Sequence, residues 1–221
     1  MPARQSSKRK RRRTGGGGGN AGSGDDSDQE DEIDPANTLN IHTVGTDIYF
    51  YEEVTVETVL KLIVHIRKLE DKLLKKAIDL PGYAPEVQVF IRSGGGDVHA
   101  GMSAMDHMLN SKVKIITVAD GMCASAATFI LLGGRVRKIR AHAYVLIHQI
   151  SVGGFWGNFE ELKDEVNHCA QIMDMLKSVY REYTGIPAKV IATLMKKDVY
   201  LTAEECLSYK VVHALACLGT A

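Results

Sequence analysis

Three side chains in the second half of the sequence could together carry out acyl transfer: Ser125, His148 and Asp198. A serine hydroxyl becomes a useful nucleophile when a base takes its proton, and a carboxylate can hold a histidine base in the right tautomer. Ser125 lies among small residues, between a β-like run and an apolar stretch that predicts a helix. A helix N-terminus would offer free N–H groups and a positive dipole end to an oxyanion. A serine at this place could also simply cap the helix or allow tight packing.

A glycine loop, Ser93-Gly94-Gly95-Gly96, precedes this segment. Glycines at a strand end let the backbone approach a ligand and turn its N–H groups inward. The loop is therefore a candidate oxyanion hole or substrate cradle, with an ordinary strand-to-helix turn as the alternative. A Walker phosphate loop is excluded, because no Gly-Lys-Ser/Thr follows.

Spacing alone leaves the base and the carboxylate open. His148 ends a short apolar run before a glycine-rich segment, where a side chain would reach the mouth of a cleft. Asp198 lies in a predicted loop before a short strand. The rival bases are His99 and His107, and the rival carboxylates are Asp164 and Asp174. These two carboxylates fall inside a predicted helix.

The elements that must position these groups alternate between strands and helices. Strands are predicted at 48–51, 86–91, 113–118, 143–147 and 199–201, and helices after Thr55, near Val98, after Asn158, at 188–195 and after Thr202. Thr55, Asn158 and Thr202 are favoured N-cap residues, and the latter two are followed three positions on by a glutamate, as in a capping box. A basic patch, Arg135, Arg137, Lys138 and Arg140, follows Gly133-Gly134. The alternation predicts an α/β domain.

Composition limits the class of protein. Lysine plus arginine and aspartate plus glutamate both number 27, so net charge favours no particular partner. The four cysteines have no metal-ligand spacing, which argues against a disulfide framework and for a reducing compartment. No apolar run reaches the roughly 18 residues that span a bilayer, and no secretory signal is recognisable. We expect a soluble, cytoplasmic protein without a membrane contact, a metal or a cofactor.

The first 38 residues differ from the rest and predict a disordered, charged and glycine-rich tail before one domain at 39–221. Lys8 to Arg13 is an unbroken basic run, and Asp25 to Asp34 is mostly acidic. The basic run could be a nuclear address or a nucleic-acid contact. A solvated tail whose two charged blocks attract each other is the plainer interpretation.

Taken in order, these motifs resemble the Clp protease proteolytic subunit family. The family's Ser-Pro-Gly-Gly loop and Ala-Gly-Met helix resemble residues 93–96 and 100–102, and its Gly-x-Ala-Ala-Ser-Met motif resembles residues 121–126. Its Met-Ile-His-Gln-Pro motif resembles residues 146–150. The family also has an aspartate before an aromatic residue and an Ala-x-Glu-Ala helix start, which resembles Asp198 with Tyr200 and residues 203–205. Thr184-Gly185 also matches a helix end in the family. The resemblance covers about residues 44 to 213. The combination is specific, although each piece alone is not.

The resemblance implies a ClpP/crotonase-like fold of repeated β-β-α units with a protruding long helix. It implies an ATP-dependent serine endopeptidase that hydrolyses unfolded proteins or peptides inside stacked homo-oligomeric rings, fed by an AAA+ unfoldase ATPase. Carried over by position, the nucleophile, base and orienting carboxylate would be Ser125, His148 and Asp198. The N–H groups of Gly96 and Ala126 would form the oxyanion hole, and the substrate would lie along Gly95, Ser151, Val152, Gly153 and Gly154.

Several departures point to a divergent or phage-type member. Gly94 replaces the family's proline and Ala126 its methionine, which should be tolerated because an oxyanion hole uses backbone N–H groups. The charged N-terminal stretch replaces the region that docks the ATPase in the family. Two alternatives stay open: a non-catalytic ring subunit, and a crotonase-like acyl-CoA enzyme, which shares the fold but needs no Ser–His–Asp set.

Overall fold

The computed structural model describes residues 41–154 and 156–216. The predicted disordered tail, the Lys8–Arg13 run and Cys217 lie outside the described residues. Cys123, Cys169 and Cys206 are free thiols. Within the described part of the chain, no helix is both long enough and apolar enough to cross a membrane.

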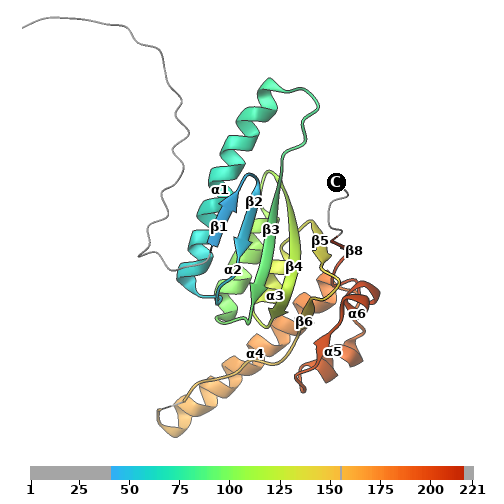
Figure 1. The fold of residues 1–221 in the computed structure, drawn as a ribbon. Helices are drawn as coiled ribbons and strands as arrows, with labels where there is room; N and C mark the ends of the chain where they lie inside the picture. The colour runs from blue at the N-terminus through green and yellow to red at the C-terminus, as the bar shows by residue number, and fades with distance from the viewer. Residues whose placement is uncertain (1–40, 155, 217–221) are drawn as a thin grey trace, which may run out of the picture. The chain divides into compact units, whose positions relative to one another are not determined.

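The described residues form a mixed α/β fold around one sheet, which confirms the predicted fold class (Figure 1). The strands are β1 (Ile41–Val44), β2 (Asp47–Phe50), β3 (Glu86–Ser93), β4 (Lys114–Ala124), β5 (Val136–Ile139), β6 (Tyr144–Leu146), β7 (Tyr200–Leu201) and β8 (Ala214–Leu215). They are ordered β1-β2-β3-β4-β5-β8, while β6 pairs with β4 and β7 pairs with β6. The β1–β2 and β6–β7 pairs are antiparallel, and the others are parallel.

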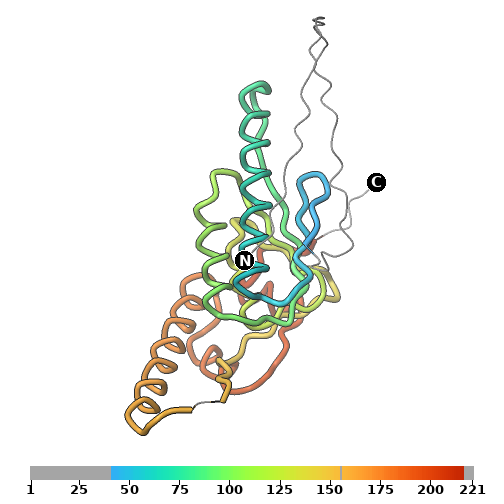
Figure 2. The backbone as a smooth tube through the Cα atoms, turned by 90° about the vertical axis from the view of Figure 1, so that its left-hand side faces the viewer, coloured from blue at the N-terminus to red at the C-terminus, as the bar shows by residue number. Residues whose placement is uncertain are grey.

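The helices are α1 (Val56–Asp79), α2 (Val98–Leu109), α3 (Ala127–Leu132), α4 (Phe159–Tyr183), α5 (Ala188–Leu194) and α6 (Ala203–Ser208). The predicted N-caps Thr55, Asn158 and Thr202 are confirmed, each with a capping box. Figure 2 shows α1 and α2 on the same side of the strands. The hydrophobic core includes every second residue of β3, namely Val87, Val89 and Ile91, which are fully buried. Burial of each such side chain stabilises the fold by about 1.5–3 kcal/mol.

Strand β4 is longer than the sequence predicts and carries the chain to the candidate nucleophile. Instead of ending at Val118 it continues to Ala124, immediately before Ser125. Its first part pairs with β5 and its last three residues pair with β6. Since β3 also contributes a pair at Cys123, the end of β4 has hydrogen-bonded neighbours on both sides.

The basic patch at 135–140 contains strand β5, which the sequence analysis does not predict. Arg137 on β5 is only 8% exposed, and its guanidinium donates to the carbonyls of Val211, Tyr183 and Lys210. Arg140 pairs with Asp120 at 3.1 Å. Arg137 therefore ties the C-terminal segment to the sheet, because a buried guanidinium needs several acceptors.

Helix α4 extends away from the sheet, as the family resemblance predicts (Figure 1). Its buried residues, Leu176 and Tyr180, both lie near its C-terminal end. Towards the other end, Phe159, Leu162 and Val166 are 69%, 43% and 60% exposed. An apolar stripe of this kind on a helix is typical of a surface that another molecule covers.

Candidate active site

Ser125 occupies a strained turn between β4 and α3. Its φ of 55° lies in the left-handed region, which is unfavourable for a residue other than glycine. The turn is held from both sides: the Ser125 N–H donates to the Leu146 carbonyl on β6 at 2.9 Å, and the Thr128 N–H donates to the Ser125 carbonyl at 2.9 Å. The hydroxyl therefore lies at the start of α3 and not within it.

The glycine loop packs directly against Ser125. Gly95 and Gly96 have φ of 99° and 144°, and a Cβ on Gly95 would lie 2.5 Å from Ser125 Cβ. A Cβ on Gly96 would lie 2.2 Å from the Val54 carbonyl oxygen. Because real Cβ atoms do not approach other atoms so closely, both positions require glycine.

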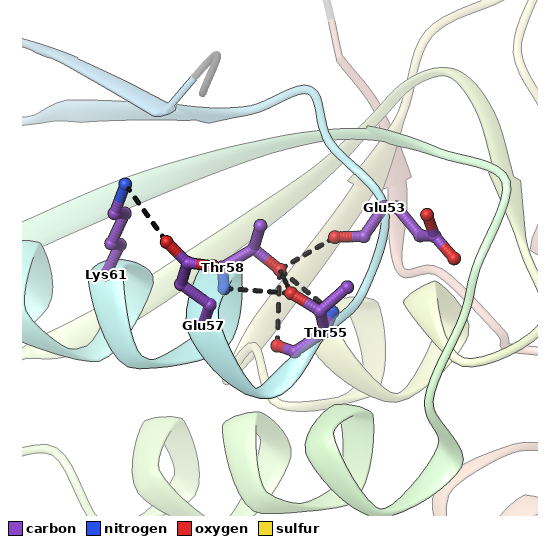
Figure 3. Close-up of polar contacts among 5 residues, drawn as sticks. All are labelled: Glu53, Thr55, Glu57, Thr58 and Lys61. Atoms are coloured by element: carbon purple, nitrogen blue, oxygen red, sulfur yellow. Dashed lines mark hydrogen bonds and ion pairs between the residues drawn. The ribbon is translucent and has the colours of Figure 1, made fainter. Parts of the chain in front are cut away.

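The start of α1 fixes the other side of the glycine loop. The Val54 N–H donates to the Gly95 carbonyl at 2.8 Å. The neighbouring residue Glu53 accepts from the Thr58 hydroxyl at 2.7 Å, and Thr58 also shares the capping box with Thr55 (Figure 3). The helix cap and the glycine loop are thus held through the same short segment.

Two backbone N–H groups beside Ser125 are available to a ligand. In the part of the chain that the structure describes, the N–H groups of Gly96 and Ala126 donate no hydrogen bond. Both residues line one cavity of about 420 Å³ together with Ser125 and His148. Free N–H groups at the edge of a cavity suit an oxygen that develops negative charge.

The register of β6 and β7 brings His148 to Asp198. Leu146 pairs with Tyr200 in this antiparallel pair, so the residues two positions beyond the pair also face each other. His148 Nδ1 lies 3.4 Å from Asp198 Oδ1, and the two side chains are 21% and 75% exposed. This separation exceeds the roughly 2.7–2.9 Å of a charge-assisted hydrogen bond. Because His148 faces Asp198 through Nδ1, Nε2 of the imidazole is left for another partner.

The cavity has an apolar floor and an open rim. Phe129, Leu176 and Tyr180 form part of the floor, and all are buried. Ser151, Val152 and Gly153 belong to the lining, whereas Gly95 and Gly154 lie outside it.

Among residues 41–154 and 156–216, no hydrogen bond joins Ser125 to His148. Catalytic hydrogen bonds are often long without substrate and tighten in the complex.

The rival residues fall in different places. His99 lies on the same cavity, with its ring centroid 6.5 Å from that of His168, while His107 lines a separate hollow beside α1. Asp164 and Asp174 are exposed on α4, and Asp174 pairs with Lys177 at 2.9 Å. The structure therefore puts Asp198, and neither rival carboxylate, beside His148. The catalytic roles themselves stay predictions.

Cys123, two residues before Ser125, is a poor alternative nucleophile. Its thiol is fully buried and donates to the Ala127 carbonyl at 3.4 Å. Burial raises the pKa of Cys123 far above its usual range, so the thiolate that nucleophilic attack requires is disfavoured.

The sequence interpretation missed two residues next to the nucleophile turn. Neither Thr128 nor Tyr180 was singled out. The structure joins their hydroxyls in a buried hydrogen bond. Nothing local in the sequence indicates a contact across 52 residues.

A serine, a histidine and a carboxylate, with free N–H groups beside the serine, are the residue types that acyl-transfer hydrolases use. Comparison with known proteins identifies the family. The family model described as Clp protease matches residues 46–216. The chain belongs to the Clp protease family, a family of peptidases.

Curated relatives agree with this assignment at modest identity. The chain is 32% identical over 158 residues to an ATP-dependent Clp protease proteolytic subunit of Adiantum capillus-veneris, covering 68% of this chain and 79% of the relative. A protein of the same name from Chara vulgaris is 32% identical over 179 residues, which are 76% and 78% of the two chains. One from Atropa belladonna is 35% identical over 133 residues, which are 59% and 68%.

Proposed function

We propose that this chain is a serine endopeptidase subunit in which Ser125 attacks the carbonyl of a scissile peptide bond. His148 Nε2 takes the hydroxyl proton and later gives it to the leaving amine, and a water molecule then hydrolyses the acyl-enzyme by the same route in reverse. Asp198 keeps the proton on Nδ1 and stabilises the imidazolium. The N–H groups of Gly96 and Ala126 bind the oxyanion.

One observation carries this proposal. The β6–β7 register brings His148 within 3.4 Å of Asp198, while the same histidine and Ser125 line one cavity. A helix-capping serine needs neither partner. A crotonase-like acyl-CoA enzyme would also have no use for the pair, and the family assignment favours the peptidase over it.

The substrate we propose is an unfolded polypeptide or a short peptide. The segment 149–154 has no regular secondary structure, and apart from the chain neighbours no described residue has an atom within 4 Å of a Cβ placed on Gly153 or Gly154. Such an open backbone edge can pair with an extended chain, as in β-strand addition. The apolar floor formed by Phe129 and Leu176 would accept an apolar side chain of the substrate.

We further propose that the subunits assemble into stacked rings around an enclosed chamber and receive substrate from an AAA+ ATPase. The exposed apolar stripe on α4 supports self-association, since Phe159 and Val166 would otherwise face water. The relatives from Adiantum capillus-veneris and Chara vulgaris are named as ATP-dependent.

The test is hydrolysis of a fluorogenic peptide and of an unfolded protein, with and without a candidate AAA+ ATPase and ATP, on a sample whose mass is measured in parallel. Ser125→Ala should abolish hydrolysis, and Ser208→Ala, which changes an exposed serine on α6, should keep it. Equal activity of wild type and Ser125→Ala would refute the proposed nucleophile. An assembled wild type without any activity would instead indicate a non-catalytic ring subunit.

A further inference from the structure

Buried hydroxyls connect the long helix α4 to the nucleophile turn. Thr128 Oγ1 lies 2.6 Å from the Ser125 carbonyl oxygen and must donate to it, because a carbonyl has no proton. A threonine hydroxyl has only one proton, so the contact between Thr128 and the Tyr180 hydroxyl must use the proton of Tyr180. The direction is therefore fixed: Tyr180 donates to Thr128, and Thr128 donates to Ser125.

The surroundings keep this relay in place. Thr128 is 1% exposed and Tyr180 is 2% exposed. The Tyr180 ring packs against Phe129 on α3 with centroids 5.5 Å apart. Burial raises the pKa of Tyr180 above its usual range, so its hydroxyl keeps the proton that it donates. In such a setting little water competes for the hydrogen bonds, and neighbouring bonds polarise one another.

The relay ends on the residue whose backbone needs support. Ser125 is held at a φ of 55°, a conformation that costs about 1–3 kcal/mol and persists only when its surroundings determine it. Its carbonyl accepts both the N–H and the hydroxyl of Thr128. Removing the hydroxyl bond would leave the peptide plane with one bond in place of two, so the Ser125 side chain would sample a wider range of directions.

We propose that Tyr180 is a positioning residue that orients Ser125 through Thr128, and that it thereby couples the placement of α4 to the reactivity of the nucleophile. This inference rests on the proposed role of Ser125. Tyr180 lines the cavity, but its hydroxyl proton is used by Thr128. It acts through its neighbour and not on the substrate.

The test replaces Tyr180 by phenylalanine, which keeps the ring and removes the hydroxyl. We expect kcat for peptide hydrolysis and the rate of labelling by a fluorophosphonate to fall about three- to tenfold, the equivalent of one hydrogen bond, while KM stays within about twofold. Thr128→Val, which also removes the bond to the Ser125 carbonyl, should cost at least as much as Tyr180→Phe, and the double variant should be no worse than Thr128→Val, because Tyr180 acts through Thr128. Thr128→Ser should restore near-normal kcat. Tyr183→Phe, three positions along α4, is the matched control.

Amide hydrogen exchange supplies a readout that does not depend on activity. In Tyr180→Phe the Thr128 amide, which donates to the Ser125 carbonyl, should exchange faster, while amides of β3 stay unchanged. Labelling and Thr128 exchange at the wild-type level in a folded Tyr180→Phe protein would overturn the relay alone. A wild type that the fluorophosphonate does not label would overturn the proposed function, and the relay with it.

Discussion

Replacement of Gly95 by alanine tests whether the glycine loop sets the position of Ser125. The new Cβ would lie 2.5 Å from Ser125 Cβ and 2.8 Å from the Ala124 carbonyl oxygen. Carbon atoms in contact prefer separations of about 3.5 Å or more, so the loop and the nucleophile must move apart by about 1 Å. The backbone φ of 99° adds strain of about 1–3 kcal/mol to any residue with a Cβ.

A displacement of this size should be costly for the reaction. Misplacing reacting groups by about 1 Å can lower rates about 100-fold, so we expect a loss of this order in kcat/KM and in fluorophosphonate labelling. Gly94→Ala is the matched control, because among the described residues its Cβ would meet just the Met122 side-chain terminus, at 3.6 Å. It should label within about threefold of wild type.

The assay compares labelling rates of wild type, Gly95→Ala and Gly94→Ala at equal mass of assembly, together with the denaturant midpoint of each. A Gly95→Ala protein that folds and labels at the wild-type rate would show that the loop does not constrain Ser125. Equal losses in the two variants would point to general damage to the loop.

Three further perturbations follow from the structure. Asp198→Asn should lower kcat about tenfold, because a charge contact near 3.4 Å in a largely aqueous setting stabilises the imidazolium by about that factor. A loss near the 10⁴-fold known for buried triads would mean that Asp198 is enclosed in the working enzyme. Burial, and secondly the charge of Arg137, lower the pKa of His213, whose Nδ1 accepts from the Arg137 backbone N–H. The neutral imidazole therefore contributes stability that is fully present above the unfolded pKa of about 6.5. This stability is lost as the pH falls through the lower folded pKa. The urea midpoint should therefore drop more between pH 7.5 and 5 in wild type than in His213→Gln, and equal drops would contradict this reasoning. Val166→Glu, in the exposed apolar stripe of α4, should reduce the mass of the assembly measured by native mass spectrometry, whereas Asn167→Glu beside it should leave the mass unchanged. Identical masses for the two variants would show that the stripe is not part of the subunit contact.

Helix starts were the most predictable part of the fold. Thr55, Asn158 and Thr202 cap helices as predicted because N-capping depends on a few neighbouring residues. The ends of strands were less predictable. The extension of β4 to Ala124 depends on pairing with β6, some 20 positions away in the sequence, and no local pattern reports such a partner.

Strand β5 was missed for a related reason. Its charged residues indicate a surface, but Arg137 is buried because three carbonyls from distant segments surround its guanidinium. Tertiary contacts here override the polarity of the side chain. The same segment shows why charge runs alone identify surfaces poorly.

The candidate site was also predictable only in part. Spacing alone left Asp198 open against Asp164 and Asp174, and the family resemblance chose Asp198. The β6–β7 register then places Asp198 beside His148. The relay through Tyr180 was invisible because it joins two helices far apart in the chain. Chemistry-bearing residues can thus be proposed from sequence, while their partners follow from topology.

A structure of the assembled protein after reaction with a peptidyl fluorophosphonate would test directly whether Ser125 is the nucleophile. We expect one covalent bond, to Ser125 Oγ, with a phosphoryl oxygen about 2.7–3.1 Å from the N–H nitrogens of Gly96 and Ala126. His148 should lie between Ser125 and Asp198. An adduct on another residue, or an oxygen directed into solvent away from both N–H groups, would contradict this expectation.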